Sequence, residues 1–163
     1  NSSRSEGLPV ALIEAGADIH AINGLRRKLS RIKGGRLAAA FAGAELWLFA
    51  LSDVPGDAIA DIGSGPCAPD PVGLAAANDA VARLGLAPPP AIAARLADPA
   101  AAPLPADHPA FRRVRAALIG RPADALAAAA TVLRDAAYAV TPLGAAQAPA
   151  VTLAAAHAPL VAT

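Results

Sequence analysis

Apolar positions in the first third of the chain recur at steps of three and four residues. The side chains with this spacing are Ile22, Leu25, Leu29 and Ile32. They form one stripe of an amphipathic helix, and Asp18 is the residue expected to cap its beginning. A shorter apolar helix is predicted over residues 9–15, closed by Gly16. Gly34 and Gly35 interrupt the pattern, and the sequence RLAAAFAG predicts that a helix begins again after them.

A continuous apolar run over residues 45–51 has no helical cap and no polar interruption. It predicts a strand of a parallel sheet that is buried on both faces. In the last third, strands are predicted over residues 114–120, 137–144 and 159–163, and helices over 122–136 and 148–158. Strands that alternate with helices are typical of βαβ units. We therefore expect an α/β fold: a single domain over residues 1–163, with an open, mostly parallel, Rossmann-like sheet flanked by helices in three αβα layers.

The middle of the chain is punctuated by glycine and proline. Their recurrence over residues 55–71 predicts a loop, and the next stretch, 74–85, predicts a helix that ends at Gly85. The proline-rich stretch 87–111 predicts a surface excursion that contains one short helix.

Composition narrows the functional classes. Hydrophobic residues make up 55% of the 163 residues, which is enough for a core, and the net charge of +1 gives no global preference for nucleic acid or acidic lipid. The single cysteine, Cys67, suits a reducing compartment, so a cytoplasmic location is expected. No apolar stretch reaches the roughly 18 residues of a membrane helix. The start resembles neither a signal peptide nor a natural domain start, and we expect the chain to be an excerpt of a longer protein.

Polar residues follow the predicted strand at 45–51. Ser52, Asp53 and Asp57 fall at the carboxyl end of that strand, which is the edge where α/β sheets bind ligands. Two carboxylates there suit Mg²⁺ beside phosphate oxygens. The alternative is that Asp53 only caps a turn and that Asp57 is solvated.

A basic segment precedes that strand and holds six of the 14 Lys and Arg residues. They are Arg26, Arg27, Lys28, Arg31, Lys33 and Arg36. On a helix, Arg26, Ser30 and Lys33 would share one face. Gly34 and Gly35 would leave free N–H groups at the start of a helix between two cations, which favours phosphate binding. A solvated basic face is the alternative, and a nucleic-acid patch is disfavoured because no aromatic residues interleave the cations.

Other polar residues carry weaker signals. The sequence GSGPCA at 63–68 follows a loop rather than a strand, so it is no dinucleotide fingerprint, although Ser64 and Gly65 could still face a ligand. Asp70, between two prolines, is interpreted as a turn residue. The histidines, which are His20, His108 and His157, lack the spacing of a transition-metal site.

Three segments in order resemble one enzyme family. INGLRRKLSRIKGGRLA, LSDVPGD and IGSGPCAPD are similar to the motifs of the bacterial and archaeal D-glycerate 2-kinases, whose members are also labelled hydroxypyruvate reductases. The family's motifs are matched by Ile22, Asn23, Leu25, Arg26, Leu29, Ser30, Lys33, Gly34, Gly35 and Arg36, then by Ser52, Asp53, Val54, Gly56 and Asp57, and then by Ser64, Gly65, Pro66, Pro69 and Asp70. The tail from residue 117 to 144 also resembles the family's later strand–helix–strand.

The resemblance implies ATP-dependent phosphorylation of the 2-hydroxyl of D-glycerate with Mg²⁺, a reaction that requires alignment and charge neutralisation. It implies that Asp53, Lys33 and Arg36 act in catalysis and that Asp53 and Asp57 bind the metal. The residues implied to bind substrate or nucleotide are Asn23, Arg26, Gly34, Gly35, Ser52, Ser64 and Gly65. The implied partners are D-glycerate and a nucleotide, with no nucleic acid and no membrane; a homodimer is left open.

The chain also departs from the family. Its glycine-rich S-G-G-G-S-A loop, an earlier lysine-bearing segment and the C-terminal MOFRL-type domain are absent from the 163 residues. We therefore expect this chain to be incomplete and inactive alone. The remaining alternatives are a non-catalytic nucleotide- or anion-binding fragment and a hydroxypyruvate reductase.

Overall fold

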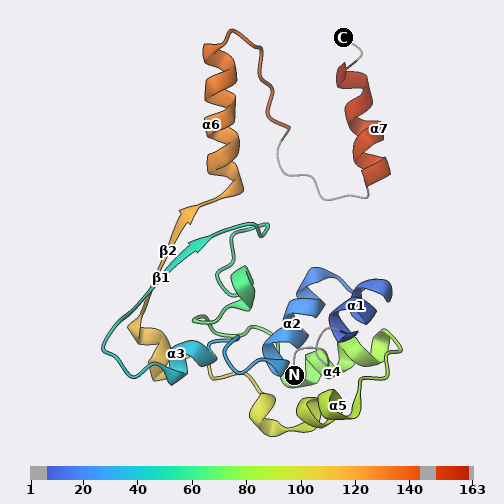
Figure 1. The fold of residues 1–163 in the computed structure, drawn as a ribbon, viewed down its shortest axis with the longest axis vertical. Coiled ribbons are helices and arrows are strands. Elements are labelled where there is room, and N and C mark those ends of the chain that lie inside the picture. The colour runs from blue at the N-terminus through green and yellow to red at the C-terminus, as the bar shows by residue number, and fades with distance from the viewer. Residues whose placement is uncertain (1–6, 144–149, 162–163) are drawn as a thin grey trace. The chain divides into compact units, whose positions relative to one another are not determined.

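The computed structural model describes residues 7–143 and 150–161. The chain divides into two compact units, residues 1–121 and residues 122–163, and each is described by itself. The helices and strands of the first unit are α1 (Gly7–Glu14), α2 (Ile19–Leu29), α3 (Arg36–Ala40), β1 (Leu46–Leu51), α4 (Leu74–Arg83), α5 (Pro90–Ala97) and β2 (Val114–Gly120) (Figure 1). Short 3₁₀ turns lie at Ile62–Ser64, Pro99–Ala101 and Pro109–Arg113. The second unit contains α6 (Pro122–Asp135) and α7 (Ala150–Val161).

The two strands pair in parallel, as the sequence predicts. Leu46 is aligned with Val114, and the register continues to Ala50 and Leu118 before a one-residue irregularity. A parallel pair needs a long crossover, and here residues 52–113 supply it. Helices combined with parallel strands confirm the predicted α/β fold.

The prediction that β1 is buried on both faces is wrong. Trp47, Phe49 and Leu51 are 60% exposed or more, whereas Leu46 and Leu48 pack against a small cluster that includes Cys67. Successive strand residues point to opposite faces, and only one face of β1 meets this cluster. Burial raises the pKa of the Cys67 thiol, which fits a packing role for this side chain.

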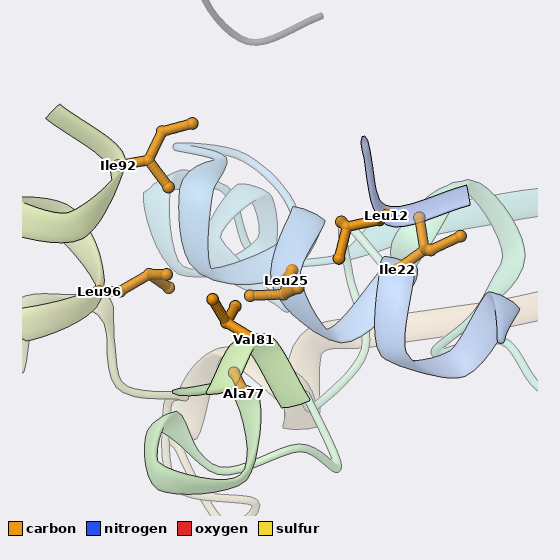
Figure 2. Packing of buried hydrophobic residues seen from close by; sticks show 7 residues of the cluster. All are labelled: Leu12, Ile22, Leu25, Ala77, Val81, Ile92 and Leu96. Atoms are coloured by element: carbon orange, nitrogen blue, oxygen red, sulfur yellow. The ribbon is translucent and has the colours of Figure 1, made fainter. Parts of the chain in front are cut away.

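The main core of the first unit packs against one face of α2 (Figure 2). Its buried side chains come from α1, α2, α4 and α5 and are Leu12, Ile22, Leu25, Ala77, Val81, Ile92 and Leu96. The Asp18 carboxylate accepts the Ala21 N–H at 2.7 Å, which confirms the predicted cap. Gly16 has a φ of 76° and closes α1, also as predicted.

Two predictions about this unit need correction. Ile32 is 55% exposed and lies beyond α2, because the chain turns extended at Ser30 and ends the helix. The proline-rich stretch 87–111 is not a surface excursion alone. Its helix α5 contributes Ile92 and Leu96 to the core, because these two residues lie one helical turn apart on the face turned towards α2.

In the second unit, α6 begins at Pro122 as predicted. The predicted strand over residues 137–144 is absent from its described part, 137–143, where Ala137 lies in a turn and the backbone after it has no regular structure. Ala137, with a φ of 65°, instead ends α6. The predicted last helix is confirmed by α7, which also takes in residues 159–161, where a strand was predicted; residues 144–149 and 162–163 lie outside the described residues. None of the helices seen in residues 7–143 and 150–161 has the length and apolarity needed to cross a bilayer.

Candidate functional site

A pocket of about 310 Å³ brings together the three motif segments of the first unit. This volume is at the lower end of the range for small-molecule sites. Its lining residues come from α2, from the turn after β1 and from the 3₁₀ segment, and they are Ile19, His20, Asn23, Arg26, Asp53, Val54, Pro55, Asp61, Gly63 and Ser64. Of the predicted site residues, the structure therefore places Asn23, Arg26, Asp53 and Ser64 in one pocket.

The helix α2 supplies one wall of this pocket. His20, Asn23 and Arg26 recur at steps of three residues, so they lie on one face of the helix. The opposite face of α2 carries Ile22 and Leu25 into the core. Because the core fixes the rotation of α2, it also fixes the direction in which the polar face points.

Asn23 and Ser64 join α2 to the GSG segment. The Ser64 hydroxyl donates to Asn23 Oδ1 at 3.2 Å, and both side chains are buried. Ser64 has a φ of 61°, and its glycine neighbours Gly63 and Gly65 are left-handed too. A Cβ on Gly65 would lie 2.5 Å from the Ala60 carbonyl oxygen, so the turn requires glycine at that position.

The amides of Gly34 and Gly35 are not free, contrary to the prediction. Gly34 N–H donates to the Ser64 carbonyl at 3.2 Å, and Gly35 N–H donates to the Gly65 carbonyl at 2.8 Å. A Cβ on Gly35 would lie 2.5 Å from the Phe111 ring. The double glycine therefore lets two motif segments bond backbone to backbone, and it contributes no lining residue to the pocket.

Arg36 is likewise engaged within the protein. Its guanidinium donates to four carbonyl oxygens, those of Arg27, Lys33, Ala101 and Ala102, at 2.7–3.2 Å. Burial, followed by the charge of Arg95, lowers the pKa of Arg36. This geometry ties α3 to α2 and to the 99–102 segment; the predicted catalytic role of Arg36 stays a prediction.

Arg26 and Lys33 are two neighbouring cations without an ion-pair partner among the described residues. The Lys33 ammonium donates to the Gly63 carbonyl at 2.5 Å, at the edge of the pocket. Burial, and then the charge of Arg26, lowers the pKa of Lys33. Lys33 lies beyond the end of α2, so the prediction that it shares a helix face with Arg26 is wrong, although the two charges still lie close together. An anion bound there would relieve their repulsion.

Arg27 and Lys28, which follow Arg26 on α2, form a buried ion cluster with Asp70. Arg27 Nε lies 2.8 Å from Asp70 Oδ1, and Lys28 Nζ lies 2.5 Å from Asp70 Oδ2. Arg27 also donates to Asp61 at 2.9 Å, and Lys28 donates to the Val72 carbonyl. The side chains of Lys28 and Asp70 are fully buried. Asp70 was interpreted from the sequence as a turn residue, and its function as the common acceptor of two buried cations was missed.

Three polar residues in the turn after β1, which are Ser52, Asp53 and Asp57, have different environments. Ser52 is buried, and its hydroxyl bonds to the backbone of Val54, which fixes the turn. Asp53 is exposed and lines the pocket. Asp57 has a φ of 56° and lies 3.7 Å from Arg121 Nε, and it is not a lining residue of the pocket.

The pocket residues could hold a hard divalent cation through the carboxylate of Asp53. Among the described residues, the Asp53 carboxylate has no hydrogen bond or ion pair that would compete for it, and Mg²⁺ in a phosphate site needs only one or two carboxylates besides waters. No group of three or more His, Cys, Asp or Glu side chains gathers within the described part of the chain. Asp57 fits less well, because Arg121 already balances its charge.

Sequence reasoning missed two pocket residues, His20 and Asp61. His20 Nδ1 lies 3.7 Å from Asp61 Oδ2. The step of three from His20 to Asn23 on α2 could have placed the imidazole on the polar face. Nothing local marks Asp61, because its partners lie 34 or more positions earlier in the chain.

Comparison with known proteins places the chain among glycerate kinase relatives. Residues 4–97, more than half of the chain, match the family described as Domain of unknown function (DUF4147). A "Putative hydroxypyruvate reductase" of Agrobacterium vitis is 47% identical over 76 residues, which are 47% of this chain and 17% of that protein. A D-glycerate 2-kinase of Thermotoga maritima is 46% identical over 63 residues, which are 39% of this chain and 15% of the relative.

A solved structure extends this similarity. The crystal structure of the glycerate kinase of Thermotoga maritima superimposes with a TM-score of 0.66 and 28% identity, and covers 82% of this chain. The match covers 30% of that kinase. The chain therefore spans less than a third of the length of the proteins it resembles.

Proposed function

The chain belongs to the family described as a domain of unknown function (DUF4147), and from its similarity to glycerate kinases we propose that it supplies one wall of the active site of an ATP-dependent D-glycerate 2-kinase. The observation that carries the proposal is the single pocket at which Arg26, Asp53 and Ser64 meet. These residues come from the three segments that carry the resemblance to glycerate kinases.

The cationic side of the pocket would hold an anionic group. Arg26 lines the pocket, and Lys33 reaches the Gly63 carbonyl at its edge. Two cations that repel each other and have no acid partner in the described residues favour a carboxylate or phosphate oxygen between them. Asn23 is already bonded to Ser64, which holds this wall in place before a ligand arrives.

The acidic side of the pocket would act on the hydroxyl group. Asp53 follows a strand and is fixed by the Ser52 turn, so its carboxylate has a rigid mount. From there it can orient the 2-hydroxyl of D-glycerate or accept its proton, and it can bind Mg²⁺. ATP and Mg²⁺ would supply the phosphoryl group and neutralise its charge; Asp57 stays a prediction as a second metal ligand.

The decisive experiment is a phosphoryl-transfer assay with D-glycerate, ATP and Mg²⁺. The assay uses the longest polypeptide that carries these residues, because the 163 residues alone are expected to be inactive. We expect ADP release that depends on D-glycerate. Absence of ADP release together with retained anion binding would favour a non-catalytic anion-binding role, and oxidation of NAD(P)H with hydroxypyruvate would establish the reductase instead.

A further inference from the structure

The imidazole of His20 occupies the end of the pocket wall opposite to Arg26. His20 is in the first turn of α2, and Arg26 is in the last. Both residues line the pocket, and the His20 side chain is 71% exposed. The polar face of α2 therefore presents two nitrogen-bearing side chains to one ligand-sized space, with Asn23 between them.

Asp61 links His20 to the buried ion cluster. One Asp61 oxygen lies 2.9 Å from Arg27 Nη1, and the other lies 3.7 Å from His20 Nδ1. Arg27 is held in turn by Asp70. The Asp61 side chain is only 13% exposed, so the cluster holds in place the carboxylate that faces the imidazole.

This arrangement assigns the two ring nitrogens of His20 to different partners. Nδ1 faces the Asp61 carboxylate, and Nε2 is the nitrogen left for a ligand. Both ring nitrogens of a protonated imidazole are donors, so Nε2–H can donate a charge-assisted hydrogen bond to an anionic oxygen while Nδ1 faces Asp61. The charged groups near His20 are Asp61, with Arg27 behind it, Arg26 farther along the same face of α2, and Asp53 from the turn after β1.

We propose that His20 binds the carboxylate of the hydroxy-acid substrate and that Asp61 and Arg27 are its positioning residues. The inference rests on the proposed kinase function, since it needs an anionic hydroxy acid in this pocket. Arg26 and His20 would then bind different anionic groups of the reactants. The carboxylate lies at the His20 end, and a phosphate oxygen lies between Arg26 and Lys33, which leaves the 2-hydroxyl beside Asp53.

Three histidines in the sequence make a direct binding test practical. The imidazole NMR signals of the 163-residue chain are followed while D-glycerate is added, with glycerol as the matched probe that lacks the carboxylate. We expect the His20 signals to move with D-glycerate and not with glycerol, while those of His108 and His157 stay in place. Unmoved His20 signals would overturn the inference. A response to inorganic phosphate but not to D-glycerate would overturn it as well.

The second test separates binding from folding and from catalysis. In the phosphoryl-transfer assay, His20→Gln should raise the KM for D-glycerate about tenfold with little change in kcat, because a charge-assisted hydrogen bond is lost. Asp61→Asn should raise the same KM by a smaller factor, and His108→Gln is the matched control. A wild-type KM in His20→Gln, or a loss confined to kcat, would contradict the assignment while the kinase proposal stands. If the wild-type polypeptide has no kinase activity, the NMR result still decides the inference.

Discussion

Three consecutive cationic residues of α2 lie in two contrasting environments. Arg26 is exposed and lines the pocket, whereas Arg27 and Lys28 are almost completely buried. The buried pair shares Asp70 as acceptor, and Arg26 has no acidic partner in residues 7–143 and 150–161. The comparison shows that one basic run can contain both buried structural cations and a cation that lines a pocket. Neighbouring residues of a helix point in different directions, and this separates the two groups.

The two groups should respond differently to mutation. A buried ion cluster contributes little net stability when complete, but losing one partner leaves an uncompensated charge in the interior. An exposed cation that lacks a partner costs little in folding, and its effect should appear when a ligand binds. Stability and ligand affinity are therefore the two measurements that test the comparison.

The largest effect is expected from Asp70→Asn. The substitution removes the charge that Arg27 and Lys28 share, so the free energy of unfolding should fall by about 3–5 kcal/mol. Urea unfolding measures this change. Asp79→Asn, on the exposed side of α4, is the matched control and should stay within about 0.5 kcal/mol of wild type. Equal stability of the two variants would show that the cluster is not structural.

Asp53→Asn tests the other half of the comparison. If Asp53 orients the hydroxyl or binds the metal, kcat in the phosphoryl-transfer assay should fall by about 10²-fold or more. The free energy of unfolding should change little, because Asp53 is exposed and makes no ion pair within the described residues. Wild-type turnover would refute the assigned role, and a large loss of stability would show that Asp53 has a structural role.

Arg26→Gln should affect ligand affinity alone. The variant loses a charged donor in the pocket, so the KM for an anionic substrate should rise about tenfold. Arg31→Gln removes a charge of the same sign five residues later, from a side chain that is exposed and outside the pocket. An equal rise in KM in both variants would mean that the field of the whole basic segment acts, rather than a contact made by Arg26.

Local sequence features predicted much of this unit, because short-range patterns determine them. The cap at Asp18, the buried stripe on α2 and the positions of the two strands all follow from neighbouring residues. The three motifs in order also predicted that Asn23 and Asp53 belong to one site, and both line the same pocket.

Contacts between distant segments could not be predicted in this way. Lys28 and Asp70 are 42 positions apart, and no periodicity connects them. Gly34 was expected to have a free amide, but its N–H donates to the Ser64 carbonyl. This bond was missed because no sequence pattern predicts the left-handed backbone of the turn at Ser64. The alternation of exposed and half-buried residues along β1 was missed because apolar side chains occupy both faces of the strand.

The smallest effect, and the finest test of the buried group, is the pH dependence that Lys28 gives to stability. Burial lowers the pKa of Lys28 below its ordinary value of 10.5, although Asp70 opposes the shift. Between the two pKa values the unfolded chain holds this proton and the folded chain does not, so the contribution of Lys28 to stability rises with pH in that window. Lys28→Met removes the ionisable group, and the stability of wild type relative to this variant should rise as the pH increases towards 10.5. The variant should also lose less stability than Asp70→Asn, because Asp70 keeps its bond to Arg27. A difference between wild type and Lys28→Met that is constant with pH would mean that Asp70 fully compensates the buried ammonium.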